Sequence, residues 1–222
     1  MMGRTMWKNP KISVRWVVVG GLVCVSSAML VRSIFGADDE GQARPTHVKV
    51  KSVLSGDKVK VKHYGRLIYA GVRAPCEGEP LYEEAKRRNA ELVFGKELRL
   101  RYGEQVRDRD GRLQAYAFLD DALLNDIMVR EGLAYVRLTT TTQRFADRLL
   151  DAQRQAREER RGLWQHVSES SDDEYAADPK YGNFHRVSCA EVPKIKPQRL
   201  VTFKSKDAAF DAGYAPCTHC LP

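Results

Sequence analysis

Three cysteines and a histidine near the C-terminus have the spacing of a metal site. His185 and Cys189 are separated by three residues in "FHRVSC", and Cys217 and Cys220 by two in "PCTHC". A two-residue spacing lets two thiolates of one turn bind the same tetrahedral ion, and a pair from another segment completes the coordination. The whole chain has five cysteines, and this odd number fits a disulfide framework poorly. We therefore expect these four residues to bind a structural zinc ion, with His219 as a bystander.

The chain as a whole has the composition of a folded, basic protein. It has 222 residues, of which 43% are hydrophobic, and a formal net charge of +8 at pH 7. This length suits one ordinary domain with small additional segments, and the apolar fraction argues against disorder along the whole chain. The positive charge favours anionic partners, such as nucleic acid or the surface of a membrane.

The N-terminal segment is predicted to associate with a membrane. Residues 1–15 are basic and contain no acidic residue, and the run from Trp16 to Val31 carries no charge. Because about 20 apolar residues span a bilayer, we interpret residues 16–35 as a single transmembrane anchor in a bacterial plasma membrane or a mitochondrial inner membrane. Two alternatives stay open: a secretory signal cleaved after residues 1–28, which would make the protein secreted, and a mitochondrial presequence. The orientation across the membrane is left open.

Hydrophobic alternation with a period of two begins at Thr46 and predicts a barrel. Three short strands are separated by "SGD" and "YG" turns, and the helical pattern "EPLYEEAKRRNAELV" follows them. Two more strands, "KELRLRY" and "RLQAYAFL", precede two helices that each end at a glycine. This order is typical of an α+β fold, a five-stranded barrel of the oligonucleotide-binding type with three helices. The expected segments are a linker at 36–45, the barrel domain at 46–167, an acidic linker at 168–174 and a compact zinc module at 175–222.

Five segments of the barrel region resemble thermonuclease-like (staphylococcal nuclease) domains. They are "SGDKVKV", "YAGVRAP", "RDRDGRLQAYAFL", "LLNDIMVREGLAYV" and "EERRGLW", in the family's order and spacing. The resemblance implies the fold, and with it a nuclease chemistry based on Ca²⁺ held by carboxylates. A glutamate that activates water and two arginines that neutralise the phosphate in the transition state complete the family's catalytic set.

The family's five roles fall on residues that fit them unequally. The first calcium aspartate corresponds to Asp57 and the second arginine to Arg112. The first arginine corresponds to Ile68, the second calcium aspartate to Arg73 and the general-base glutamate to Cys76. Two of the five roles therefore keep a suitable side chain, and Arg73 places a positive charge where the resemblance implies a divalent cation. The sequence predicts a largely degenerate nuclease site.

Neighbouring residues offer an alternative in which the enzyme is active. Arg66 lies two residues before Ile68 on the same strand, and Glu77 and Glu79 follow Cys76 in a glycine-containing loop. Arg66, Glu77 and Glu79, together with Arg112, are therefore candidate catalytic residues of a Ca²⁺-dependent endonuclease that cleaves DNA or RNA.

Lysines on the second strand form the candidate nucleic-acid-binding surface. Lys58, Lys60 and Lys62 are spaced by two residues and should lie on one face of the strand. Barrels of this type also bind single strands through stacking rings. The candidates for stacking, which more often pack in a core, are Tyr64, Tyr69 and Tyr116.

The tail from Phe184 to Cys220 is similar to the zinc module of the bacterial Ada DNA-repair protein. In that module all four ligands are cysteines, and the first one accepts a methyl group from DNA. His185 occupies the first position here, and an imidazole lacks the zinc-activated thiolate that takes the methyl group. The resemblance therefore implies zinc and proximity to DNA, without direct repair of methylated phosphates.

These observations together favour a membrane-tethered nucleic-acid-binding protein with a structural zinc module and a degenerate nuclease site. An active endonuclease is the first alternative. The second is a scaffold subunit of a membrane complex, whose protein partners the sequence does not identify.

Overall fold

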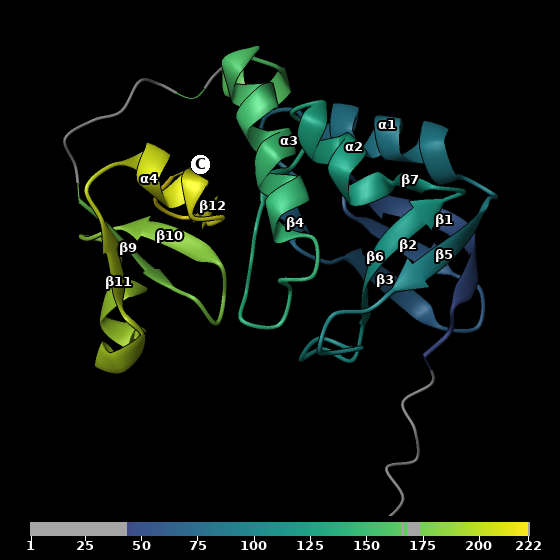
Figure 1. Ribbon diagram of the computed structural model, residues 1–222, viewed down its shortest axis with the longest axis horizontal. Helices are drawn as coiled ribbons and strands as arrows, with labels where there is room; N and C mark the ends of the chain where they lie inside the picture. The colour runs from purple at the N-terminus through teal and green to yellow at the C-terminus, as the bar shows by residue number, and fades with distance from the viewer. Residues whose placement is uncertain (1–43, 166, 168–173, 222) are drawn as a thin grey trace, which may run out of the picture. The chain divides into compact units, whose positions relative to one another are not determined.

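The computed structural model describes residues 44–165, 167 and 174–221. These residues belong to one compact unit (Figure 1). The predicted membrane segment, residues 16–35, lies outside the described residues, as do the basic N-terminal segment and most of the linker that follows. Within the described part of the chain, no helix combines the length and the apolar character that crossing a membrane requires.

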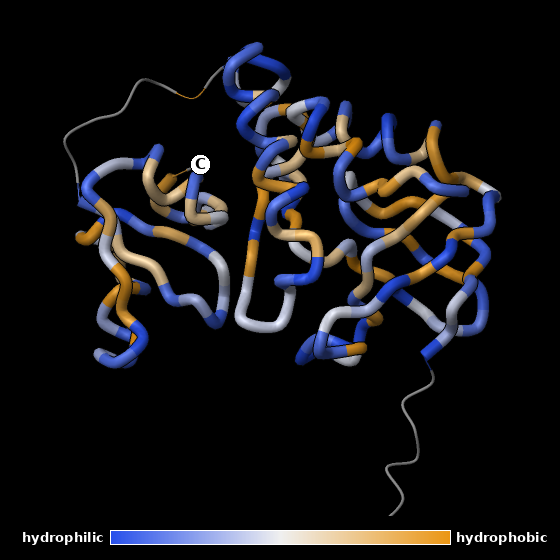
Figure 2. The backbone as a smooth tube through the Cα atoms, viewed as in Figure 1, coloured by the Kyte–Doolittle hydropathy of each residue, from blue (hydrophilic) through white to orange (hydrophobic). Residues whose placement is uncertain are grey.

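A closed five-stranded barrel forms the larger part of the structure. The antiparallel order β3-β2-β1-β5-β6 is closed by a parallel pairing of β3 with β6. Valines of β1 and β2 alternate with polar residues, so that Val48, Val50, Val59 and Val61 face the interior. Hydrophobic and hydrophilic stretches alternate visibly along these strands (Figure 2). The strands are β1 (His47–Ser55), β2 (Lys58–Val61), β3 (Gly65–Tyr69), β5 (Glu97–Arg101) and β6 (Leu113–Leu119).

Three helices accompany the barrel, as the sequence predicts. They are α1 (Tyr82–Val93), α2 (Leu124–Arg130) and α3 (Ala146–Glu158). Short strands complete this part: β4 (Val72–Arg73) pairs with β8 (Tyr135–Val136), and β7 (Ala122–Leu123) pairs with β6. The predicted α+β barrel with three helices is confirmed.

Two buried asparagines fasten the helices to the strands. On α1, the side chain of Asn89 accepts a hydrogen bond from the Tyr69 hydroxyl (3.0 Å) and donates one to the Ser55 carbonyl (2.8 Å). On α2, Asn125 accepts from the Ala117 N–H (3.0 Å) and donates to the Ala70 carbonyl (2.7 Å). Since a buried polar group is costly unless it is paired, these four bonds fix the strand ends on which the candidate site is built.

Residues 174–221, which we call the C-terminal module, contain a small mixed sheet with the order β11-β9-β10-β12. Its core is aromatic: Phe184 lies edge-on to Tyr175 and Phe210, with ring centroids 5.5 and 5.1 Å apart. The elements are β9 (Tyr175–Asp178), β10 (Asn183–Arg186), η2 (Val192–Lys194), η3 (Pro197–Arg199), β11 (Val201–Phe203), α4 (Lys206–Asp211) and β12 (Ala215–Pro216).

The C-terminal module packs against the last helix and last strand of the barrel. The buried side chain of Gln153 on α3 accepts from the Val136 N–H (2.8 Å) and donates to the Phe210 carbonyl (2.9 Å). Trp164, in the 3₁₀ helix η1 (Gly162–Gln165), lies edge-on to the Phe210 ring at 4.9 Å. The N–H of Leu138 donates to the Gly213 carbonyl (2.8 Å). The module and the barrel therefore share a buried, hydrogen-bonded interface.

Candidate functional site

A cavity of about 450 Å³ collects the residues on which the nuclease roles fall. Asp57, Ile68, Arg73, Cys76 and Arg112 all line it. These positions lie on the β1–β2 turn, on β3, on β4, in the loop after β4 and just before β6. The predicted correspondence thus places five residues from separate segments around one cavity.

Asp57 is held at the edge of this cavity by a tight turn. Gly56 is required there, because a Cβ at this position would lie 2.7 Å from the Cβ of Ala74. The Asp57 side chain is buried, and its Oδ1 accepts hydrogen bonds from the Ser55 hydroxyl (2.7 Å) and from Lys58 Nζ (2.9 Å). The carboxylate therefore already has a cationic partner within the protein.

Arg73 is buried, and its charge is balanced by Glu79. Arg73 Nη2 donates to Glu79 Oε1 at 2.6 Å, while the Cys76 N–H donates to Glu79 Oε2 at 2.6 Å. The Arg73 guanidinium also lies over the Tyr135 ring, 5.6 Å from its centroid. Its Nη1 atom is buried and has no hydrogen-bond partner among the described residues. Glu79 consequently acts as the counter-ion of Arg73 and is not among the residues that line the Asp57 cavity.

Of the other candidate catalytic residues and the lysines of β2, some line the cavity and some lie on the open surface. Arg66 and Glu77 are exposed and do not line the cavity. Lys58 lines it, whereas Lys60 and Lys62 are exposed on the outer side. Lys60 pairs with Arg66 across the β2–β3 ladder, which places two cations next to each other beyond Lys58.

Arg112 is oriented by two aspartates of its own loop. Its Nε donates to Asp108 Oδ2 at 2.7 Å, and its Nη2 forms ion pairs with Asp108 and Asp110. The Asp108 Oδ1 atom also accepts the N–H groups of Asp110 and Arg112, each at 3.0 Å. The guanidinium is therefore held in place, but much of its charge is neutralised locally.

Arg137, directly after β8, is a cavity residue that the sequence did not reveal. It lines the cavity, and its side chain has no hydrogen bond or ion pair with any residue in the described part of the chain. Burial lowers the pKa of Arg137, and the neighbouring Arg73 and Arg112 lower it further, whereas Asp57 opposes the shift. An unpaired, desolvated cation of this kind favours binding of an anion.

Cations outnumber carboxylates around the cavity. Six cationic side chains line it, against three carboxylates. The cations are Lys58, Arg73, Arg109, Arg112, Arg137 and Lys180, and the carboxylates are Asp57, Asp108 and Asp110. No single stretch of sequence predicts this excess of cationic side chains, because the cavity is lined by residues of both the barrel and the C-terminal module.

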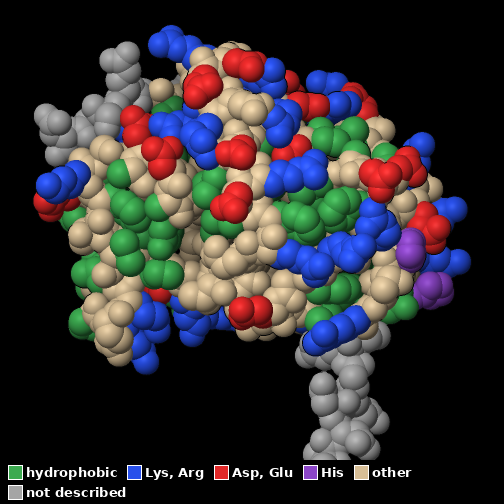
Figure 3. Space-filling model, in the orientation of Figure 1, with side chains coloured by type: hydrophobic (Ala, Val, Ile, Leu, Met, Phe, Trp, Pro, Cys, Tyr) green, Lys and Arg blue, Asp and Glu red, His purple; other side chains and the backbone are tan. Residues whose placement is uncertain are grey.

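The arginines of α3 do not add to this surface in the same way. Arg154 pairs with Asp151, Arg148 with Asp126, and Arg157 with Asp207 and Asp211. Charges of both signs are interleaved over the face of the molecule that Figure 3 shows. This pattern is typical of a solvated, ion-paired helix surface.

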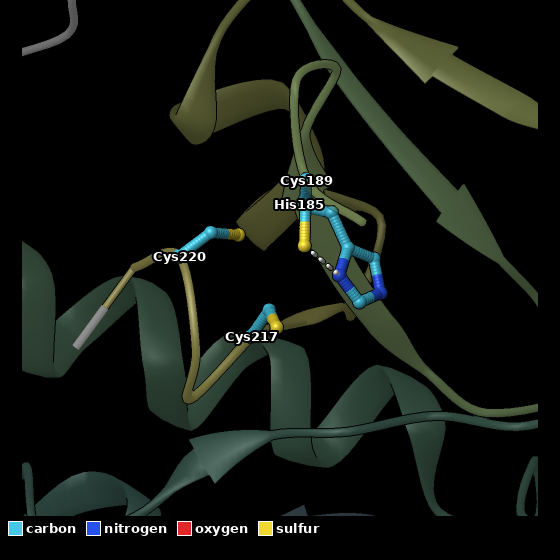
Figure 4. A group of neighbouring side chains, drawn as sticks. All are labelled: His185, Cys189, Cys217 and Cys220. Carbon is cyan, nitrogen blue, oxygen red and sulfur yellow. Dashed lines mark hydrogen bonds between the residues drawn. The ribbon is translucent and has the colours of Figure 1, made fainter. Parts of the chain in front are cut away.

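The four predicted zinc ligands converge in the C-terminal module (Figure 4). His185 lies on β10, Cys189 in the turn after it, and Cys217 and Cys220 follow β12. One ligand atom from each residue lies within 4.8 Å of all the others. Burial lowers the pKa of His185, which favours the neutral imidazole that binds metals. Among the described residues, this is the one group of three or more His, Cys, Asp or Glu side chains that could hold a metal ion.

Calcium fits the barrel cavity poorly. A Ca²⁺ ion takes six to eight oxygen ligands, and three carboxylates line this cavity, those of Asp57, Asp108 and Asp110. Each of them already forms an ion pair, Asp57 with Lys58 and the other two with Arg112.

A family model, that of staphylococcal nuclease homologues, matches residues 55–166. The chain belongs to the staphylococcal nuclease family. The thermonuclease of Staphylococcus hyicus is 27% identical over 164 residues, which are 66% of this chain and 97% of the relative. Endonuclease YncB of Bacillus subtilis is 27% identical over 56% of this chain and 64% of the relative. An uncharacterized endonuclease of Escherichia coli is 30% identical over 53% of this chain and 76% of the relative.

Membership of this family supports a nuclease or nucleic-acid-binding function. The family match ends before the C-terminal module, so neither zinc nor the likeness to the Ada module follows from the comparisons. The matched region contains most of the closed five-stranded barrel and all three of its helices.

Proposed function

We propose that this chain binds nucleic acid by placing backbone phosphates in the cationic cavity, and that it does so without calcium-dependent cleavage. The carrying observation is that Arg137 and Arg73 line the same cavity, and that among the described residues the guanidinium of Arg137 has no hydrogen-bond partner and that of the buried Arg73 lacks one for its Nη1 atom. A phosphate oxygen in the cavity would accept hydrogen bonds from guanidinium N–H groups that have no partner among the described residues. Charge-assisted bonds between guanidinium and phosphate are among the stronger hydrogen bonds in proteins.

The same residues argue against hydrolysis. Ile68 and Cys76 stand at the positions of an arginine and a glutamate in the family's catalytic set, and the nearby Glu79 is bound to Arg73. Loss of a single preorganised charge-stabilising donor costs about 10²–10³ in kcat. Several such losses together leave binding as the function that these side chains support.

The experiment that tests this function uses the full chain and a labelled single-stranded oligonucleotide, with either Ca²⁺ or a calcium chelator. We expect salt-sensitive binding in both conditions and an intact oligonucleotide after incubation. Calcium-dependent cleavage would overturn the proposal in favour of the alternative that the names of the relatives suggest, an endonuclease. Absence of binding at moderate salt would favour a scaffold subunit instead.

For the C-terminal module, we propose a structural zinc ion bound by His185, Cys189, Cys217 and Cys220. What supports it is the convergence of four ligand atoms of the types that closed, tetrahedral zinc sites use. Metal analysis of the purified chain should find about one zinc per protein. A metal-free protein with a fully folded module would contradict the proposal.

We also propose that residues 16–35 hold the chain at a membrane. The support is the uncharged run from Trp16 to Val31 behind a basic segment. In cells, the full chain should stay in the membrane fraction after alkaline carbonate extraction, whereas a soluble product that starts near residue 29 would support the cleaved signal.

A further inference from the structure

The C-terminal module supplies part of the wall of the cationic cavity. Lys180 and Tyr181 come from the turn between β9 and β10, Asn183 from the start of β10, and Thr218 from between Cys217 and Cys220. The C-terminal module therefore supplies both the proposed zinc ligands and part of the cavity wall. None of these residues belongs to the region that the nuclease family model matches.

The β9–β10 turn is rigid before any ligand arrives. The Asp178 carbonyl accepts the N–H groups of Tyr181 (2.9 Å) and Gly182 (3.1 Å), and the Asp178 carboxylate accepts the N–H of Lys180 (2.9 Å). Arg199 binds the same carboxylate with Nε at 3.0 Å and Nη2 at 2.8 Å. Burial raises the pKa of Asp178, but the hydrogen bonds from Arg199 and Lys180 outweigh it and hold the pKa below its usual value.

The same turn is fixed against the barrel. The Thr140 N–H donates to the Pro179 carbonyl at 3.2 Å. Gly182 has a φ of +70°, and a Cβ at this position would lie 2.4 Å from the Leu138 carbonyl oxygen. Only glycine allows this approach, so the backbone sets the position of the neighbouring Tyr181.

The Tyr181 ring is an exposed aromatic surface next to a cation at the cavity. Tyr181 is 47% exposed, whereas Tyr69 and Tyr116, which the sequence offers as stacking candidates, are buried in the core. The Arg109 guanidinium lies 4.6 Å from the ring centroid, and its Nη1 donates to the Tyr181 hydroxyl at 3.0 Å. Aromatic rings and arginine planes are the groups on which proteins stack unpaired bases.

We propose that Tyr181 and Arg109 form a base-stacking subsite, so that the ligand of the cavity is an unpaired nucleotide of single-stranded nucleic acid. This inference rests on the proposed binding of phosphates in the cavity. The phosphate lies among Arg73, Arg112 and Arg137, and the base attached to the same nucleotide stacks against the Tyr181–Arg109 pair. The cavity volume of about 450 Å³ lies within the range of about 300–1,000 Å³ that small-ligand sites occupy. A paired base in a duplex has no free face to offer.

The test compares two decamers of equal charge with the full chain: (dT)10 and a decamer of abasic nucleotides. The wild-type chain should bind (dT)10 about tenfold more tightly, because stacking on an aromatic ring strengthens binding by about this factor per base. Tyr181→Ala should remove this preference and leave the affinity for the abasic decamer unchanged. Tyr181→Phe, which keeps the ring, should retain the preference. The matched control is Phe94→Ala, which removes an exposed ring that does not line the cavity.

Each outcome decides the matter. Equal wild-type affinity for both decamers would overturn the stacking subsite and leave phosphate binding intact. A preference for (dT)10 that survives Tyr181→Ala would move the subsite elsewhere and overturn the inference as well. If the wild-type chain binds neither decamer, the proposed function itself fails. A Tyr181→Ala protein that loses affinity for both decamers equally would show that Tyr181 has only a structural role.

Discussion

The barrel and the C-terminal module of this chain differ in the size of their hydrophobic cores. The barrel cluster contains 29 buried hydrophobic residues, whereas the cluster of the module contains seven, two of which come from the barrel side. A core as small as that of the module rarely suffices without a metal or a disulfide. The four side chains that could hold a metal ion lie in the module, the region with the smaller core.

Metal removal should give the largest difference in stability between the C-terminal module and the barrel. Stripping zinc with a strong chelator, or replacing Cys217 by Ser, should unfold most of residues 174–221, because on the order of 10 kcal/mol of zinc binding is coupled to the folding of such modules. Segment-resolved amide hydrogen exchange should show loss of protection in the module and retained protection in the barrel. Cys76→Ser, a change at an exposed cysteine outside the cluster, is the control and should leave both regions protected.

A loss of barrel protection equal to that of the module would mean that the two regions fold as one. The shared interface through Gln153 would then carry more of the barrel's stability than the large barrel core suggests.

Breaking the Arg73–Glu79 ion pair should cause the next largest loss of stability, and this loss should be confined to the barrel. Arg73→Met leaves the half-buried Glu79 carboxylate without its guanidinium, and removal of one partner of a buried pair costs about 3–5 kcal/mol. Urea denaturation of the full chain should show this loss in the transition of the barrel. The double variant Arg73→Met/Glu79→Gln should recover part of it, since no unpaired charge remains. A single variant as stable as the wild type would show that Glu79 has another partner.

The sequence predicts the parts of this site that depend on local patterns better than the parts that depend on contacts between distant segments. The alternation in β1 and β2 and the Cys-x-x-Cys knuckle are local patterns. The strands that the alternation predicts are present, and the four candidate ligand residues lie close together. The five residues to which the resemblance assigns the nuclease roles all line one cavity, and a fold resemblance supplies long-range information of this kind that a local pattern lacks.

The residues that escaped prediction all depend on tertiary contacts. In the sequence, Arg137 is an ordinary position after a short strand. Only the fold buries it, with its N–H bonded to the Gly71 carbonyl and the charges of Asp57, Arg73 and Arg112 acting on it. Tyr181 meets Arg109 across 72 residues of sequence. The sequence makes Glu79 a candidate catalytic residue because a local pattern does not give the direction of its loop, and the structure turns its carboxylate onto Arg73.

Removal of the unpaired cation should weaken binding without weakening the fold. Arg137→Ala should lower the affinity for a single-stranded oligonucleotide about tenfold, or about 1.4 kcal/mol, because it removes guanidinium donors that no group in the described part of the chain uses. The slope of log K against log salt should become shallower by about 0.7, the value of one phosphate contact on a single strand. Arg87→Ala on α1 removes the same charge at a residue that does not line the cavity and should change neither quantity. An unchanged affinity for Arg137→Ala would remove the main support for the anion site.

The smallest loss of affinity is expected for Lys60, on the outer side of β2. Comparing it with Lys58 tests whether binding depends on a specific cavity or on surface charge alone. Lys60 is exposed and acts on a phosphate through solvent, so Lys60→Ala should lower affinity by about two- to threefold, within the range of a screened surface charge. Lys58→Ala should cost clearly more, because Lys58 lines the cavity and its loss leaves the buried Asp57 carboxylate uncompensated beside the bound phosphate. Filter binding at two salt concentrations separates the two variants. Equal effects would mean that the strand works as a uniform basic track, and that the cavity adds nothing to the attraction of the lysines.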